Sequence, residues 1–210
     1  TLALETGCDA EFDGGNTAWA GLEVSEKAQL TIRGKGNLSA TGGEGGGAGI
    51  GGSSQSLNVG SITILDGNIT ATGNCGGAGI GSGVGGAAAE AINIKGGNVI
   101  ATGGDGRPRN SGDPVPPGPG IGSHLVGGNP DQNIPGKASG TVTISGGTVY
   151  AYGGEHATLD QYAGGIQAQK LSSDKGSTVI YTNDDELPGV GNASSLNAII
   201  WERAKGDTTT

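Results

Sequence analysis

Several residue types that globular chains normally use freely are scarce in this sequence of 210 residues. It has no methionine, two cysteines, 3% aromatic residues, and 11 Lys and Arg against 20 Asp and Glu. So few basic residues, without an aromatic RNA-binding motif, argue against a nucleic-acid partner. No apolar run approaches the roughly 18 residues of a membrane-spanning helix, so we expect no membrane insertion.

Glycine, by contrast, supplies 47 residues, about three times its ordinary share. A strict Gly-X-Y period is absent, which excludes a collagen triple helix. Long α-helices are not expected either, because each interior glycine costs roughly 1 kcal/mol relative to alanine.

A repeated phrase organises the chain. It reads LTIRGKGNLSATGG at 30–43, ITILDGNITATGN at 62–74, INIKGGNVIATGG at 92–104 and VTISGGTVYAYGG at 142–154. A second phrase follows each copy: GAGIG at 47–51, GAGIG at 77–81, GPGIG at 118–122 and AGGIQ at 163–167. The N-terminal stretch fits at a constant offset of 28 residues, which places Leu2 and Leu4 at the positions of Leu30 and Ile32. Such regular spacing is typical of a repeat architecture.

Apolar residues alternate with period two within each unit, as in short strands. In one unit the inward pairs are Ile62 and Ile64, Ile69 and Ala71, and Ala78 and Ile80. Three short strands in about 30 residues, with Gly, Asn and Asp at the corners, predict one coil of a parallel β-helix. The fold class is therefore all-β: a right-handed, three-sided parallel β-helix, with the hand taken from the strong bias of parallel crossovers.

We count about five coils, at 2–22, 30–50, 62–80, 92–121 and 142–166, within a β-helix region spanning 1–175. Residues 176–203 are expected to form a C-terminal partial sixth coil and cap, with Trp201 as a lid. Residues 204–210 are expected to begin a linker, so the chain would be part of a larger multidomain protein.

Alternation also predicts which side chains face outward. The second face presents Ser39, Thr41, Thr70, Thr72, Ile100, Thr102, Tyr150 and Tyr152. The third face is almost bare, with glycine at alternating positions such as 49, 79 and 120. Two interpretations stay open for this glycine strip: a flat surface for a ligand or another chain, or a tight corner that needs an unusual backbone.

Enlarged corners break the symmetry at 104–118, 123–139 and 154–162. Long loops on a rigid scaffold are where binding usually occurs. Tyr150 and Tyr152 lie beside two of these loops, and aromatic rings suit the C–H faces of sugars. The candidate ligand-binding residues are Tyr150, Tyr152, Tyr162, Asp105, Arg107, Arg109, Glu155 and His156. The alternative is that both tyrosines pack beneath the loops.

Signals for catalysis are weak. The acidic residues scatter, His124 and His156 lack metal-ligand partners, and the run Asp184 to Glu186 is typical of a solvated loop. We therefore assign no catalytic residue, no metal site and no cofactor. Calcium stays an alternative, because Asp side chains and carbonyl groups crowd the corners, although no DxDxDG ladder is present.

The phrases ITILDGNITATG and INIKGGNVIATGG, each followed by a G-[AP]-G-I-G turn, resemble repeats of Gly-rich parallel β-helix modules in surface proteins of Gram-positive, mostly clostridial and gut, bacteria. The chain is similar there to the clostridial cellulose- and pectin-binding β-helix family, over roughly residues 2–167. The resemblance implies a secreted or wall-attached, extracellular adhesin-like module that binds a host or plant poly- or oligosaccharide without cleaving it.

Three alternatives stay open. A polysaccharide lyase or hydrolase could use the same scaffold, although clustered carboxylates on one face are missing. The outward Ser and Thr could form an ice-binding surface, but Ile100, Tyr150 and Tyr152 interrupt the array. The domain could also be a structural spacer.

The two cysteines are predicted to stay unbridged. Cys8 falls at the position of Gly36 and Cys75 near that of Glu44, on different corners and two coils apart. Two coils are roughly 10 Å along the axis, whereas a disulfide needs Cα atoms within about 7 Å.

Overall fold

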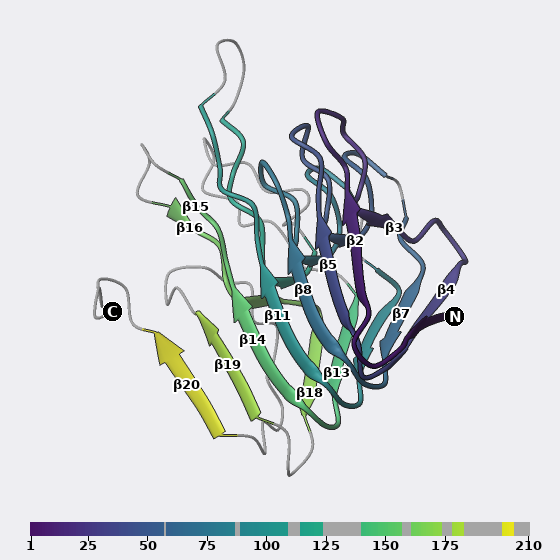
Figure 1. The fold of residues 1–210 in the computed structure, drawn as a ribbon. Coiled ribbons are helices and arrows are strands. Elements are labelled where there is room, and N and C mark those ends of the chain that lie inside the picture. The colour runs from purple at the N-terminus through teal and green to yellow at the C-terminus, as the bar shows by residue number, and fades with distance from the viewer. Residues whose placement is uncertain are drawn as a thin grey trace.

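A computed structural model of the chain describes residues 1–56, 58–86, 89–108, 114–123, 140–156, 161–173, 178–182 and 199–203, with backbone only at 161–162, 178–182 and 199–203. The described residues form strands and turns and contain no helix, so none that could cross a membrane. The chain winds through three parallel sheets in about five turns (Figure 1). This is the predicted three-sided parallel β-helix.

Each sheet collects one strand from successive coils. Sheet A contains β1 (Leu2–Leu4), β4 (Gln29–Gly34), β7 (Ser61–Ile64), β10 (Ala91–Ile94), β13 (Thr141–Ile144) and β18 (Lys170–Ser173). Sheet B contains β2 (Asp9–Asp13), β5 (Asn37–Thr41), β8 (Asn68–Thr72), β11 (Asn98–Thr102), β14 (Thr148–Tyr152), β19 (Thr178–Thr182) and β20 (Ile199–Arg203). Sheet C contains β3 (Leu22–Glu23), β6 (Ile50–Gly51), β9 (Ile80–Gly81), β12 (Ile121–Gly122) and β17 (Ile166–Gln167).

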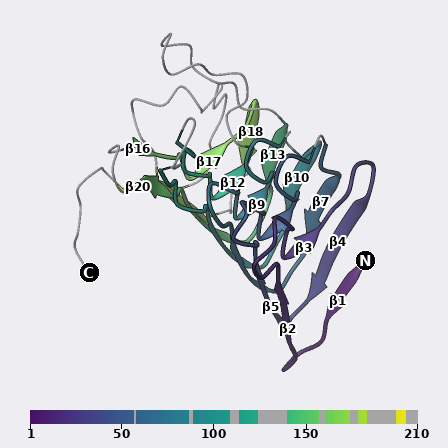
Figure 2. The same cartoon turned by 90° about the horizontal axis from the view of Figure 1, so that it is seen from above.

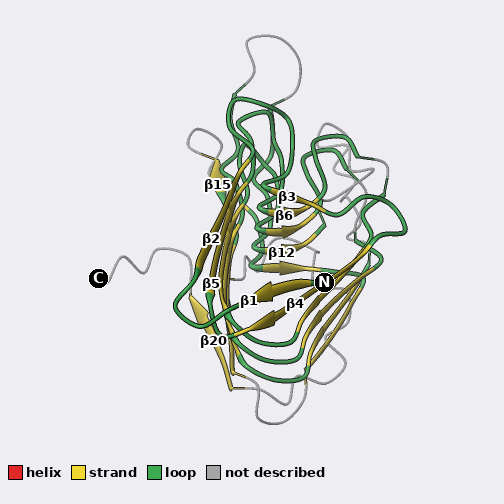
Figure 3. Cartoon of the chain, turned by 45° about the vertical axis from the view of Figure 1, so that its right-hand side comes forward, coloured by secondary structure: helices red, strands yellow, loops and turns green. Residues whose placement is uncertain are grey.

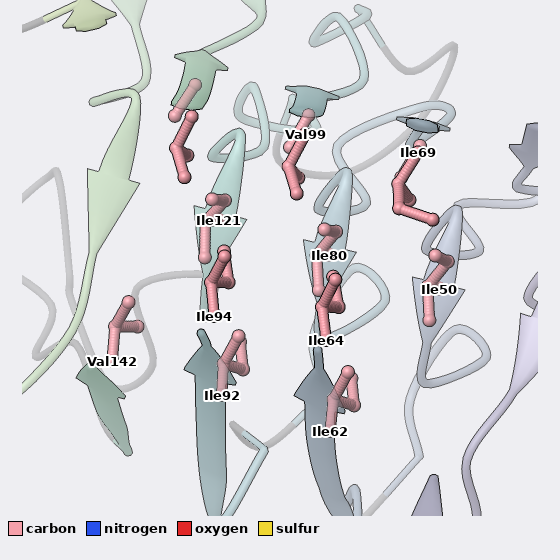
Figure 4. Packing of buried hydrophobic residues seen from close by; sticks show 14 of the residues in the cluster. Ile50, Ile62, Ile64, Ile69, Ile80, Ile92, Ile94, Val99, Ile121 and Val142 are labelled. Atoms are coloured by element: carbon pink, nitrogen blue, oxygen red, sulfur yellow. The ribbon is translucent and has the colours of Figure 1, made fainter. Parts of the chain in front are cut away.

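The three sheets surround a common interior (Figure 3). The core in this interior is a column of aliphatic side chains, mostly Ile, Val and Leu. Ile62, Ile64 and Ile80 of one coil lie beside Ile92, Ile94 and Ile121 of the next (Figure 4). All six inward residues predicted for the third coil are buried, whereas Thr70 is exposed. Because a shift of one residue would exchange the two faces of a strand, these burials confirm the predicted alternation.

Side-chain amides reinforce the corner between sheets A and B. Asn37 Nδ2 donates to Asp9 Oδ1 at 2.7 Å, and Asn68 Nδ2 donates to Asn37 Oδ1 at 2.9 Å. The same residues face one another in the strand register, which runs from Asp9 through Asn37 and Asn68 to Asn98. These hydrogen bonds thus connect the first residues of β2, β5 and β8.

The predicted register of the first strand is wrong by two residues. Leu2 pairs with Ile32 and Leu4 with Gly34, rather than with Leu30 and Ile32. The reason is that β4 continues to Gly34 at a φ of 105°, where no side chain competes with Leu4. Leu4 Cδ1 reaches within 3.1 Å of the position that a Cβ would take at Gly67. A shift of two preserves the inward direction, so Leu4 is still buried.

The glycine strip of the third face is a close backbone contact and not an open surface. Gly49, Gly79 and Gly120 are buried. A Cβ at Gly79 would lie 2.6 Å from Thr102 N and 2.8 Å from Ala71 O, both on sheet B. Only residues without side chains let the chain return so close to sheet B. Of the two interpretations of the strip, the ligand-binding surface is wrong and the backbone requirement holds.

β19 and β20 both pair in parallel beyond β14 on sheet B (Figure 1), with Trp201 opposite Ile180 and Ile180 opposite Tyr150. The view from above shows the strands of sheet A in succession from β1 to β18 (Figure 2). The side chain of Trp201, the loop 124–139, the acidic run 184–186 and the linker 204–210 lie outside the described residues.

We predict that Gly79→Ala destabilises the protein by more than about 3 kcal/mol, because its methyl group would overlap backbone that cannot move aside. The free energy of unfolding in denaturant measures this. Gly7→Ala is the matched control: Gly7 has a φ of 79° but nothing within 4 Å of its Cβ position, so it should lose only about 1 kcal/mol. Equal losses in the two variants would contradict the close-contact interpretation.

Neither cysteine forms a disulfide, as predicted; Cys8 is exposed and Cys75 is buried. We therefore expect thiol titration of the unreduced, unfolded chain to find two reactive groups. The folded chain should show one fast group, Cys8, and one slow group, Cys75, because the reagent must wait for local opening to reach a buried thiol. A monomer with no free thiol after unfolding would rule this out.

Candidate functional site

Two rows of outward side chains run across the coils on sheet B. In one row Thr41 pairs with Thr72, Thr72 with Thr102, and Thr102 with Tyr152. In the parallel row Ser39, Thr70, Ile100 and Tyr150 stand in register. Both tyrosines are half-buried, on strand β14. The rigid strand pairing therefore sets the side chains of each row one coil apart and places a tyrosine of β14 in both rows, and the row of Ser39 continues beyond Tyr150 to Ile180 of β19.

An open groove of about 420 Å³ lies along the threonine row, where the strands of sheet B end. Its lining includes Thr41, Thr72, Thr102, Asn74, Asp105 and Arg107. The turns that begin at Gly73 and Gly103 form the other wall. Cys75 belongs to this wall and adopts a φ of 46°, a left-handed conformation that is uncommon for residues other than glycine.

The enlarged corner of the fourth coil is anchored to the fifth coil beside this groove. Asp105 Oδ1 accepts a hydrogen bond from the Glu155 N–H at 3.1 Å, and the Gly106 N–H donates to Glu155 O at 2.9 Å. Arg107 and Val115 close the base of the loop through an antiparallel bridge. The loop thus begins as ordered structure, and Asp105 and Arg107 are held at the groove.

The structure brings together only part of the predicted site. Tyr152 continues the threonine row, Asp105 and Arg107 line the groove, and exposed Glu155 lies next to Asp105 through its backbone. His156 is buried with 2% exposure, and its ring lies below Gly106, so it does not face the outer surface. Tyr162 pairs with Glu155 through the two-residue strands β15 (Glu155–His156) and β16 (Gln161–Tyr162). Arg109 lies outside the described residues.

Sequence reasoning missed the groove itself, together with Asn74 and the role of Thr41 and Thr72 in lining it. The Thr-Gly step at the ends of β5, β8 and β11 was the available signal, since it places a hydroxyl group at the end of the sheet B strand in three successive coils. Hydroxyl, amide and guanidinium groups can form hydrogen bonds with the polar groups of a sugar. An aromatic ring beside them can stack on the face of the sugar ring. In the described part of the chain, no three His, Cys, Asp or Glu side chains gather as metal ligands.

Comparison with known protein families matches the chain to the family described as Beta helix repeat, over residues 30–54, 62–84, 92–128 and 142–164. These four segments cover just over half of the sequence and coincide with coils two to five. No curated protein and no solved structure matches the chain.

We predict that Asp105→Ala loosens the junction between the fourth and fifth coils, because the Glu155 N–H loses its acceptor. Amide hydrogen exchange at Glu155 should become several times faster. Asp105→Asn keeps an acceptor oxygen and should preserve slow exchange. Unchanged exchange in Asp105→Ala would show that this contact does not order the corner.

Proposed function

The chain belongs to the beta helix repeat family, and on this scaffold we propose that it is a non-catalytic glycan-binding module of a secreted or cell-surface protein. The observation that carries the proposal is the threonine row in register with Tyr152, beside an open groove. Sugars are recognised in this way, because a ring stacks on an aromatic face while its hydroxyl groups reach polar side chains.

Other features support binding without cleavage. The carboxylate of Asp105 accepts a backbone hydrogen bond from Glu155, which gives it a structural role in holding the loop. The resemblance of the repeats to Gly-rich modules of clostridial surface proteins points to the same function and to an extracellular location. The ligand would be a host or plant polysaccharide.

The groove also favours a ligand that covers several weak contacts over one tightly enclosed sugar. Its walls are open, and its polar groups come from different coils. A shallow surface orders few contacts per sugar unit, so the affinity for a monosaccharide should be low. Multivalent display, as on an array, is therefore the suitable first assay.

Replacement of both tyrosines tests the proposal. We expect Tyr150→Ala combined with Tyr152→Ala to weaken binding to the best ligand of a glycan array at least tenfold, about 1.4 kcal/mol. Leu65→Ala is the matched control, because it removes an exposed apolar side chain that follows a sheet A strand. Full binding by the double variant would place the site elsewhere.

The same assay addresses the enzymatic and calcium-dependent alternatives. Incubation of the domain with the bound polysaccharide should release no new reducing ends, and the chelator EDTA should leave binding unchanged. New reducing ends would show a hydrolase or lyase, and loss of binding in EDTA would show a calcium requirement.

A further inference from the structure

The turns that follow the sheet B strands, called the rim below, carry exposed carboxylates in three coils, and one of these carboxylates, that of Asp105, lines the groove. Each sheet B strand leads into a glycine whose N–H donates to the next coil: Gly42 to Thr72 O, Gly73 to Thr102 O and Gly103 to Tyr152 O, each at 2.8 Å. Two residues after Gly42, Gly73, Gly103 and Gly153 stand Glu44, Cys75, Asp105 and Glu155. The three acidic residues are exposed, so the rim carries negative charge on three of four coils.

In the part of the chain that the structure describes, the charged residues near the rim are mostly acidic. Arg107 is the one basic residue among the described residues that line the groove. The first strand of sheet B, β2, carries three further exposed carboxylates, at Asp9, Glu11 and Asp13. The basic residues Arg33 and Lys95 lie on or next to strands of sheet A, on a different face. A rim that carries mostly negative charge repels negatively charged ligands and so weakens their binding.

The row of polar contacts has a direction and a length. From Thr41 to Tyr152 it crosses four coils, and at about 4.8 Å per coil it spans roughly 14 Å. The residues of this row occupy equivalent positions on successive strands, so their side chains lie on a line parallel to the axis of the β-helix. A ligand that uses the whole row must be extended and must lie along this axis.

We infer that the groove selects an uncharged, extended glycan chain laid along the helix axis across several coils, and that its acidic rim disfavours polyuronates. The inference rests on the proposed glycan-binding function and names the class of ligand for that site. Its two elements come from different observations: the charge preference from the rim, and the extended pose from the strand register.

Titration of the folded chain with two matched series of oligosaccharides tests the inference. The neutral series contains 1,4-linked glucose, mannose and xylose oligomers from disaccharide to hexasaccharide, and the acidic series contains galacturonate oligomers of the same lengths. Neutral affinity should rise with length up to the tetrasaccharide and then level off. Galacturonate oligomers should bind at least tenfold more weakly at low ionic strength and should recover part of this loss at high ionic strength, where charges are screened.

Charge-neutralising variants identify the rim as the cause. Glu44→Gln combined with Glu155→Gln should raise the affinity for galacturonate several-fold relative to the affinity for neutral oligomers, because removing two negative charges relieves repulsion only for a charged ligand. Glu26→Gln is the matched control, since Glu26 lies between a sheet C strand, β3, and a sheet A strand, β4, away from sheet B, and its carboxylate is 3.6 Å from Lys27. Tighter binding of galacturonate than of every neutral oligomer, an affinity that does not depend on length, or no response to the double variant overturns the inference but leaves the proposed function in place. Failure of every saccharide to bind overturns both.

Discussion

The structure depends on the close approach of bare backbone to the inner side of sheet B. In each coil the chain leaves sheet B, turns, and returns so close to it that a methyl group at Gly79 would lie 2.6 Å from Thr102 N. This contact lets sheet C begin immediately, and its two-residue strands then contribute fully buried isoleucines such as Ile50, Ile80 and Ile121. Glycine is therefore abundant because the coil requires it, and the small apolar fraction suffices because each coil fills only a narrow column.

The same constraint explains which parts of the fold the sequence could predict. Period-two alternation identified the inward Ile62, Ile64 and Ile80, since burial of one side of a strand leaves a direct trace in the sequence. The first strand was placed two residues out of register, because alternation is unchanged by a shift of two and only the extension of β4 to Gly34 decides between the two pairings. The sequence also did not decide between the two interpretations of the glycine strip, because the absence of a side chain does not reveal whether backbone or a ligand fills the space.

The candidate site was less predictable than the fold. Tyr152 was identified because its aromatic ring lies beside enlarged corners, and Asp105 because it belongs to one of them; the structure places Asp105 in the groove lining and Tyr152 in register with the threonines of the groove. The groove wall is built from turns at Gly73 and Gly103, whose positions depend on hydrogen bonds between coils that no local pattern specifies. His156 shows the converse, since a polar residue in a long corner is buried below Gly106 once the corner folds back on the scaffold.

Strand pairing also fixes the spacing of side chains on the outer surface of sheet B, because this spacing equals the distance between successive coils. Side chains in the rows of Thr41 and Ser39 cannot adjust this spacing individually, because it is set by the backbone hydrogen bonds beneath them. If the repeat distance of a bound polymer differs from the distance between coils, its units no longer face equivalent side chains after a few repeats. This difference in spacing limits how many coils can contact one polymer chain at the same time. A longer β-helix would therefore add further short binding sites and would not extend a single site.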